Sequence, residues 1–381
     1  MNLLRRGAHA RRTAATPGAL LALLAACGPG TVGLECTDES VALATPKTRA
    51  DIAALAHIST IDDLFVEESE LEDLHGLECV TTIGRLSVRE NPRLRSLRGL
   101  DNVQEVGPET FMNGDYSAMV IKGNPVLESV ANLSSLEYVS GALEVSHNDA
   151  LRELAGLESL EFIQNVFYVM DNAVLEEVRL DAYRGTDLER TEYAGGMYVR
   201  RNSVLRKLDI PLTLNSAALE MSNNPKLEDV TLAYQGFPSA YDIAYNAMLT
   251  ELPGASEPND DVHLSVCGNA TLTSLRGLER AVGGVVLICT NPELGNLSGL
   301  ENLVSSSRLR IVDNLQLASL AALDPDRGGK LSHIEMGADL EITGNASLDE
   351  CEAQAFANAL AAKTTEVHPV VADNRPNGAC P

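Results

Sequence analysis

A short pattern of apolar and polar positions recurs along the chain after residue 60. Two apolar residues separated by one residue are followed, after two more residues, by an asparagine and then by a leucine three residues later. Most of these asparagines lie 22 to 24 residues apart. An internal repeat of this length is typical of a solenoid. The repeating asparagines are Asn91, Asn124, Asn148, Asn172, Asn202, Asn224, Asn246, Asn269, Asn291, Asn314 and Asn345.

The offsets within one repeat predict its structure. Leu143 and Val145 precede Asn148 and lie two residues apart, so their side chains point to the same face of a short β-strand. The later leucines follow at steps of three, which suits a tight turning path better than an α-helix. One such turn cannot bury its apolar face alone, so the turns must stack into a parallel sheet at about 4.8 Å per rung. The asparagine amides would then bond to one another as an internal ladder.

The unit from Leu143 to Glu158 carries a family resemblance. Its sequence, Leu-Glu-Val-Ser-His-Asn-Asp-Ala-Leu-Arg-Glu-Leu-Ala-Gly-Leu-Glu, resembles the repeat of receptor L domains, the leucine-rich-repeat-like right-handed β-helices of growth-factor receptor ectodomains, and similar repeats of bacterial lipoproteins. The resemblance covers residues 40 to 348 and implies a mainly β fold, a right-handed parallel β-solenoid of about 12 rungs. It implies little about function, because such repeats keep their core and vary their surface.

The first 27 residues read as an export signal. Four arginines and no acidic residue precede the apolar run Ala19–Ala26, which is too short to span a bilayer. The sequence Leu24-Ala25-Ala26-Cys27-Gly28 resembles a bacterial lipobox, which implies cleavage before Cys27 and acylation of that cysteine. Gly28, in place of an aspartate, resembles the signal for sorting to the outer membrane. An ordinary secretory signal is the alternative.

Six further cysteines predict disulfides, because an even number in an exported chain is typical of a disulfide framework. Six cysteines allow fifteen pairings. Spacing favours Cys36 with Cys79, Cys267 with Cys289, and Cys351 with Cys380. Cys267 and Cys289 each lie two residues before a ladder asparagine, so stacking would bring them within disulfide reach on adjacent strands. Two free thiols, or part of a metal site, are the alternatives for that pair.

These features divide the chain into four segments: residues 1–26 as the signal peptide, 27–50 as the lipid-anchored tether and N-terminal cap, 51–348 as the solenoid, and 349–381 as a C-terminal helical cap with a disulfide-tied tail. Caps are needed because a bare terminal rung exposes apolar surface and unpaired strand edges. Asp349 followed by Glu352 resembles a helix start. The apolar stripe of that helix would be Ala353, Phe356, Ala359 and Leu360.

Composition narrows the classes of partner. The formal net charge is −25, and removal of the four arginines before Cys27 leaves 25 basic residues (29 − 4) against 54 acidic ones, a net charge of −29. Such a charge repels phosphate backbones and anionic headgroups, so we expect no nucleic-acid partner and no membrane contact beyond the lipid anchor. Aromatic residues make up only 4% of the chain and Trp is absent, which favours one stacked aliphatic core.

No catalytic motif accompanies the repeat. The sequence lacks G-x-S-x-G, H-E-x-x-H, G-x-x-x-x-G-K and C-x-x-C, so we expect neither an enzyme nor a cofactor. One stretch matches the spacing of a calcium loop, with Asp324, Asp326 and Glu335 at positions 1, 3 and 12. Gly328 at position 5 and Pro325 depart from that pattern, and an acidic insertion between rungs is the competing interpretation.

The exposed strand positions supply a candidate binding surface. They lie four and two residues before each ladder asparagine, and on the middle rungs they are rich in Tyr and Arg, the residues that most often anchor protein interfaces. An insertion between these rungs, Leu180–Gly196, adds further tyrosines, and a loop longer than the repeat needs is more often functional. An exposed sheet also carries tyrosine without any ligand, which is the structural alternative. The candidate ligand-binding residues are Tyr168, Met170, Tyr198, Arg200, Arg201, Tyr183 and Tyr193.

The sequence therefore favours a binding module. We expect an exported lipoprotein, at the outer membrane or cell surface of a bacterium, that presents its solenoid to a protein, peptide or glycan ligand. The first alternative is a structural spacer of the cell envelope with no specific ligand. The second is an enzyme whose catalytic residues follow no familiar motif.

Overall fold

The computed structural model describes residues 35–107, 117–186, 195–214, 217–363 and 367–376. The chain divides into two units, Met1–Glu35 and Cys36–Pro381, and the fold described here is that of the second unit. It is mainly β and forms a parallel β-solenoid of about 11 turns, with a short helix near its C-terminal end. The predicted fold class is thus confirmed, with about 11 turns where about 12 were expected.

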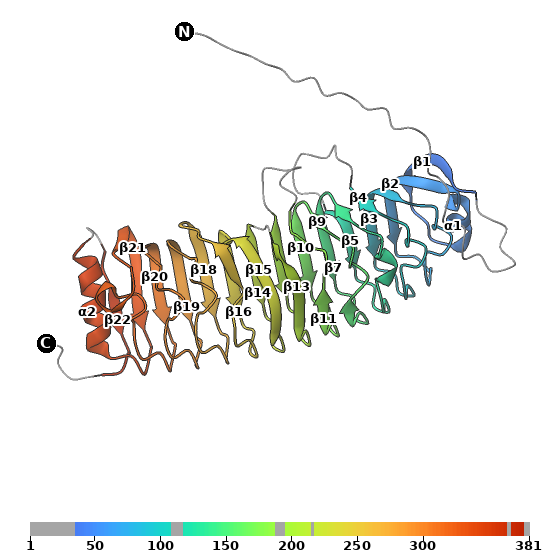
Figure 1. Ribbon diagram of the computed structural model, residues 1–381. Helices are drawn as coiled ribbons and strands as arrows, with labels where there is room; N and C mark the ends of the chain where they lie inside the picture. The colour runs from blue at the N-terminus through green and yellow to red at the C-terminus, as the bar shows by residue number, and fades with distance from the viewer. Residues whose placement is uncertain (1–34, 108–116, 187–194, 215–216, 364–366, 377–381) are drawn as a thin grey trace, which may run out of the picture. The chain divides into compact units, whose positions relative to one another are not determined.

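One parallel sheet of 17 strands runs through all the turns (Figure 1). Three of its strands are only two residues long and form a side branch, in which β4 (Glu105–Val106) pairs with β3 (Thr82–Arg89), β6 (Tyr138–Val139) with β4, and β9 (Phe162–Ile163) with β6. Its main run, in order of pairing, is β1 (Thr37–Ala44), β2 (Ile58–Glu67), β3 (Thr82–Arg89), β5 (Ser117–Lys122), β7 (Ala142–Ser146), β10 (Val166–Met170), β12 (Gly196–Arg200), β14 (Ala218–Ser222), β16 (Ala240–Ala244), β18 (Val262–Cys267), β19 (Gly284–Cys289), β20 (Ser305–Val312), β21 (His333–Thr343) and β22 (Val370–Ala372).

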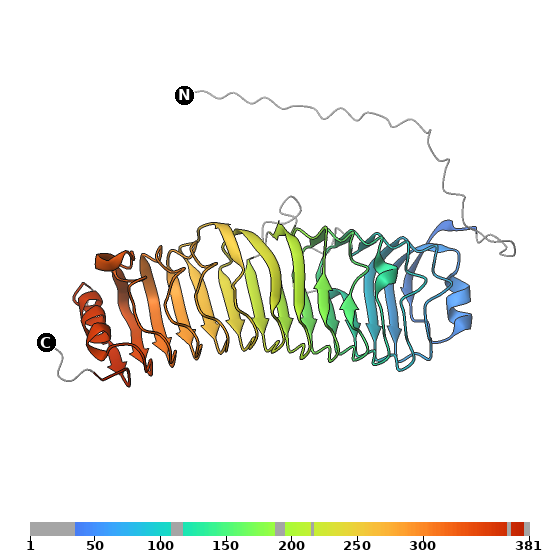
Figure 2. The same ribbon diagram turned by 60° about the horizontal axis from the view of Figure 1, so that its bottom comes forward.

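A second parallel sheet forms in the middle turns. It lies on the return path, the segment that leads from each ladder asparagine to the next strand of the main sheet, where the sequence predicted only tight turns. Its third and fourth strands are the longest, and the strands before and after them are shorter; Figure 2 shows the stacked turns from a second side. They are β8 (Glu153–Leu154), β11 (Glu177–Arg179), β13 (Lys207–Leu214), β15 (Asp229–Gly236) and β17 (Gly254–Glu257). On the other turns the return path is made of loops and two 3-10 turns, η1 (Ala131–Leu133) and η2 (Pro325–Arg327).

Aliphatic side chains fill the interior at the predicted offsets. In the turn around Asn148, Leu143, Val145, Leu151 and Leu154 are all fully buried. The predicted steps of three have a hydrogen-bond counterpart, because the N–H of Leu151 donates to the carbonyl of Asn148 at 3.1 Å. Such bonds between residues three apart belong to 3-10-like turns, and they bring every third side chain to the same inner side.

The ladder asparagines are buried and bonded as the repeat predicts. The Oδ1 atom of Asn202 accepts the backbone N–H of Asn172 at 3.1 Å and its side-chain N–H at 3.2 Å. The Nδ2 atom of Asn202 donates to the carbonyl of Val169 at 2.9 Å and to Oδ1 of Asn224 at 3.3 Å. Each amide therefore joins three successive turns, and eleven asparagines from Asn91 to Asn345 share this arrangement, all with no exposed surface.

The ladder extends beyond the asparagines that the repeat pattern identified. At its start, Ser69 donates both its backbone N–H and its hydroxyl to Oδ1 of Asn91. At its end, Asn374 accepts the N–H of Asn345 at 3.2 Å, and its own N–H donates to Glu350 at 3.1 Å. Strand β1 likewise lies before the predicted 51–348 segment and β22 after it, so the stacking continues through both predicted caps.

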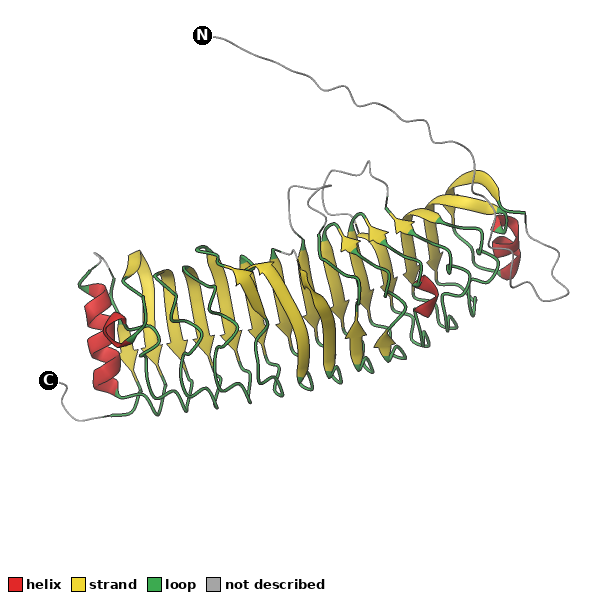
Figure 3. Ribbon diagram, in the orientation of Figure 1, coloured by secondary structure: helices red, strands yellow, loops and turns green. Residues whose placement is uncertain are grey.

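A helix lies near each end of the unit (Figure 3). The first, α1 (Arg49–Leu55), was not predicted, although Thr48 and Asp51 form a capping box at its start and Ile52 is buried. The second, α2 (Glu350–Ala361), begins at Asp349 as expected.

The apolar face of α2 differs from the prediction at one position. Its buried residues are Ala353, Phe356, Ala357 and Leu360, whereas Ala359 is exposed. An α-helix turns 100° per residue, so Ala357, four residues after Ala353, shares the inner stripe.

Two of the predicted disulfides are present. Cys36 bonds to Cys79 with a Cα–Cα distance of 5.4 Å, and Cys267 bonds to Cys289 with a Cα–Cα distance of 4.5 Å. Strands β18 and β19 place the second pair directly opposite each other, as the ladder register predicts. Cys351 is also in a disulfide, while Cys380 lies outside the described residues. Disulfides of this kind indicate an oxidising compartment, such as exported proteins meet.

Replacing a ladder asparagine should destabilise the fold more than replacing a surface asparagine. In Asn202→Ala the buried carbonyl of Val169 loses its donor and two neighbouring amides lose a partner, so we expect a loss of about 3 kcal/mol in the free energy of unfolding. The control is Asn302→Ala, which removes two surface hydrogen bonds, one donated to the backbone carbonyl of Glu279 and one accepted from Lys330, and should cost about 1 kcal/mol or less because both are exposed. Denaturant titration measures both, and equal losses would contradict a structural role for the ladder.

Candidate binding surface

Two adjacent strands bring together four of the predicted site residues. In the β10–β12 pair, Tyr168 lies opposite Tyr198 and Met170 lies opposite Arg200. The two tyrosine rings are 5.3 Å apart between centroids and tilted by 33°. All four side chains are half-buried. The predicted adjacency is confirmed, and these four residues are called the tyrosine patch below.

Arg200 is held in place by two contacts. Its guanidinium carbon lies 4.7 Å from the ring centroid of Tyr198, within cation–π range. It also forms an ion pair with Glu220, the residue opposite Tyr198 on β14. The Nε atom of Arg200 is buried and has no hydrogen-bond partner among the described residues. The side chain is therefore largely ordered before any partner arrives.

Arg201 lies at the corner after the strand and not on the strand face. Its backbone is left-handed, with φ at 52°. Its guanidinium donates two hydrogen bonds, of 2.7 and 2.6 Å, to the carboxylate of Asp171 at the equivalent position of the preceding turn. The hydrogen bond from Arg201 holds the pKa of Asp171 below its ordinary value. Arg201 thus has an internal partner next to the tyrosine patch.

The structure corrects the prediction for Tyr183. Its side chain is 3% exposed and packs 6.0 Å from the ring of Phe167, so it belongs to the core and does not reach a partner. Burial raises the pKa of the Tyr183 hydroxyl well above its ordinary value. Tyr183 follows the buried Leu180 by three residues, the same step that places leucines inside other turns, and this spacing is the signal that could have identified it. Tyr193 lies outside the described residues.

Carboxylates border the tyrosine patch on both sides along the stack. On one side, Glu144 lies opposite Tyr168 and pairs with Lys122 at 3.1 Å. On the other side, Asp242 lies opposite Glu220 on the next strand. Burial raises the pKa of Asp242, and the charge of Glu220 raises it further, although a hydrogen bond from Ser265 opposes them. One carboxylate oxygen of Asp242 is buried without a hydrogen-bond partner among the described residues.

The structure does not bring the calcium candidates together into a site. Asp324 caps the 3-10 turn η2 by accepting the N–H of Asp326 at 3.0 Å, and Glu335 lies exposed on strand β21. Within the described ranges, no group of three or more His, Cys, Asp or Glu side chains could hold a metal ion. The start of this stretch forms the 3-10 turn η2 between strands β20 and β21.

Comparison with known proteins found similarity to solved structures alone. No protein-family model and no curated protein matches the chain. Among solved structures, the chain is similar to one in the crystal structure of a TLR13–ssRNA13 complex, with 12% sequence identity and a TM-score of 0.18. The match covers 89% of this chain and 62% of that chain, so this chain spans less than two thirds of its length. In the described ranges, no helix is long and apolar enough to cross a bilayer.

The environment of Asp242 predicts a pH-dependent stability effect beside the tyrosine patch. Because the pKa of Asp242 is raised in the folded state, its charge destabilises the fold above that pKa, and the penalty disappears once the pH is below the unfolded value of 3.8. Asp242→Asn should therefore raise the midpoint denaturant concentration at pH 7 but leave it unchanged near pH 3. Denaturant titration at the two pH values tests this, and a loss of stability at pH 7 would contradict it.

Proposed function

We propose that this chain is an exported, lipid-anchored protein of the bacterial cell envelope whose solenoid presents the tyrosine patch to a protein, peptide or glycan partner. The observation that carries the proposal is the stacked pair Tyr168 and Tyr198, with Arg200 over the second ring, on the outer face of the sheet. Tyr and Arg contribute disproportionately to binding energy where a partner covers them.

Preorganisation supports this assignment. Both tyrosines stand on strands of a continuous sheet, and Arg200 is held by Tyr198 and Glu220, so little side-chain entropy remains to be lost on binding. Met170 lies beside them and has a flexible thioether side chain that adapts to the shape of a partner. A rigid aromatic pair next to an adaptable side chain suits a specific contact of modest size.

The border of the patch favours a partner with a basic group. Glu220 and Asp242 lie on the next two strands, and only Glu220 has an arginine partner. A lysine or arginine of a bound segment would relieve the unfavourable burial of the Asp242 carboxylate. The strong overall negative charge of the chain acts in the same direction.

The proposed location rests on two independent features. The disulfides indicate an oxidising compartment. The lipobox-like sequence around Cys27 lies outside the described residues, and its resemblance supports acylation of Cys27 and sorting to the outer membrane or cell surface. We propose no enzymatic activity, no cofactor and no nucleic-acid partner.

A spacer without a ligand is the second candidate function. The observation that favours it is the internal pairing of Arg200 with Glu220 and of Arg201 with Asp171, because both guanidinium groups already have a carboxylate partner. The two functions predict different results at the tyrosine patch.

A photoreactive phenylalanine analogue at position 198 should crosslink a partner in intact cells. The same analogue in place of Leu287, which lies at the equivalent position of β19, serves as the control. Gel shifts of the immunoprecipitated protein should show a discrete adduct from position 198 alone. No adduct, or the same adducts from both positions, would favour the spacer.

Removing the patch should abolish partner binding without unfolding the protein. We expect Tyr198→Ala with Arg200→Ala to weaken binding by a hundredfold or more, since two anchors of about 1.5 kcal/mol or more each are lost. The melting temperature should change by only a few degrees, because both side chains lie on the outer face. The control is Arg310→Ala, which breaks a similar cross-strand ion pair with Glu341 far from the tyrosines. Retained binding in the double variant would refute the assignment.

Lipid attachment can be tested with two variants in a bacterial host. Cys27→Ser should abolish incorporation of labelled palmitate and release the protein from the membrane fraction. Gly28→Asp should keep the label but move the protein from the outer to the inner membrane, if the residue after the cysteine directs sorting. Labelling that survives in Cys27→Ser would contradict acylation at that residue.

A further inference from the structure

The return side of the solenoid carries a ladder of alternating charges. Six consecutive turns place an arginine or a glutamate, in strict alternation, four residues after the ladder asparagine, and three pairs are joined at 2.8, 3.2 and 3.8 Å. The residues are Arg95, Glu128, Arg152, Glu176, Arg206 and Glu228. Each charge thus has opposite charges at the same position of the neighbouring turns.

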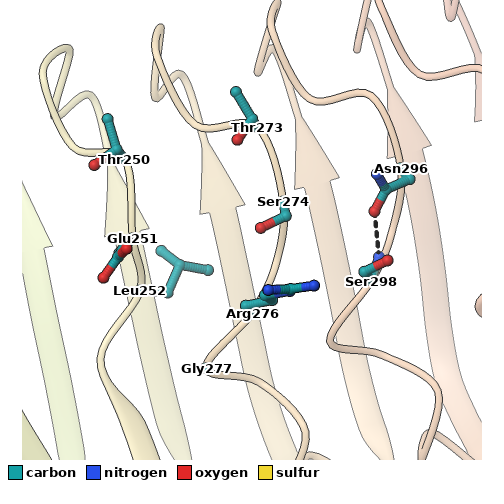
Figure 4. Close-up of a pocket in the computed structure, with 9 residues that line it drawn as sticks. All are labelled: Thr250, Glu251, Leu252, Thr273, Ser274, Arg276, Gly277, Asn296 and Ser298. Carbon is teal, nitrogen blue, oxygen red and sulfur yellow. Dashed lines mark hydrogen bonds between the residues drawn. The ribbon is translucent and has the colours of Figure 1, made fainter.

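The ladder of charges stops at the next turn. The same position is occupied by Thr250, Thr273 and Gly295 in the following three turns. Short side chains replace long paired ones, and the second sheet also ends here, at β17. The surface is accordingly hollowed into an open depression of about 690 Å³ (Figure 4). Its polar lining includes Thr250, Glu251, Ser274, Arg276, Asn296 and Ser298.

The floor of the depression is closely packed backbone. Gly277 has φ at 108°, and a Cβ atom added there would lie 2.4 Å from the carbonyl oxygen of Leu252 on the preceding turn. Leu252 itself is 7% exposed. The floor therefore tolerates no side chain at Gly277, and the depression keeps its depth.

The polar groups of the depression are available to a ligand. Within the described part of the chain, the side chains of Arg276, Ser274 and Thr250 have no ion pair and no hydrogen bond. Asn296 uses its Oδ1 atom to accept the N–H of Ser298 at 2.9 Å, which leaves its amide N–H groups free. Figure 4 shows the guanidinium of Arg276 extending toward the turn that carries Asn296 and Ser298. This contrasts with Arg200 and Arg201, which are both ion-paired.

We infer that this depression binds an acidic saccharide, with Arg276 holding its carboxylate. An unpaired guanidinium is the group best suited to a carboxylate, which it meets with two parallel hydrogen bonds. Hydroxyl and amide side chains on three successive turns supply donors and acceptors for sugar hydroxyls, and the carboxylate of Glu251 accepts from them. The volume falls within the usual range of small-ligand sites. The site is separate from the tyrosine patch and does not depend on the proposed function.

Calorimetric titration of the purified full chain with digalacturonate tests the inference. We expect saturable binding of digalacturonate and at least about tenfold weaker binding of the neutral disaccharide lactose, which lacks the carboxylates. Inorganic phosphate should not compete at equal concentration, because it lacks the hydroxyl groups that the threonine, serine and asparagine side chains would bond. No binding of digalacturonate, or equal binding of lactose, would overturn the inference, and competition by phosphate would reduce the site to a simple anion contact and overturn it as well.

Two matched variants locate the binding. Arg276→Gln should weaken digalacturonate binding at least about tenfold and leave thermal unfolding unchanged, because the side chain is exposed and unpaired. Arg280→Gln is the control, since Arg280 is also exposed, lies on the same turn and does not line the depression. Equal effects of the two substitutions would show a general charge effect and overturn the assignment. Tyr198→Ala should leave digalacturonate binding intact, which separates this site from the tyrosine patch.

Discussion

The asparagine ladder is the interaction on which the rest of the structure depends. Each turn leaves its strand through a residue with a left-handed backbone. In several turns this residue is not glycine, as at Glu90, Asp171 and Arg201, and there the conformation costs roughly 1 to 2 kcal/mol. The buried amide that follows offsets this cost, because it bonds to the backbone of both neighbouring turns. The ladder thereby fixes where every strand ends, and so it fixes the register of everything on the outer face.

That register explains which features could be predicted from the sequence. Cys267 and Cys289, like Tyr168 and Tyr198, hold the same position relative to their asparagines, so adjacency in space follows from spacing along the chain. The burial of Tyr183 was missed because the insertion shifts its turn by one position, and only the step of three from Leu180 shows that it returns to the core. Asn374 was missed because α2 interrupts the repeat before the ladder resumes.

The return side was harder to predict because its structure depends on neighbouring turns. Whether a short run forms a strand there depends on the next turn offering a matching run, as β13 and β15 do for each other. A single repeat carries no signal for this. The alternation of arginine and glutamate that begins at Arg95 and Glu128 can be recognised only when successive turns are aligned on their asparagines. The same holds for the later change to Thr250.

The tyrosine patch and the depression around Arg276 differ in whether their arginines have ion-pair partners. This difference follows from the stacked architecture. Each turn contacts only its neighbours, so an outward side chain is constrained chiefly by the residue at the same position one turn away. Where that neighbour has the opposite charge, as Asp171 has for Arg201, the surface is ordered without a ligand. Where the neighbours are short and neutral, as they are around Arg276, the charge stays unpaired and a hollow remains beside it. A change of a few side chains on successive turns can therefore create or remove a binding surface without disturbing the core that the asparagines hold together.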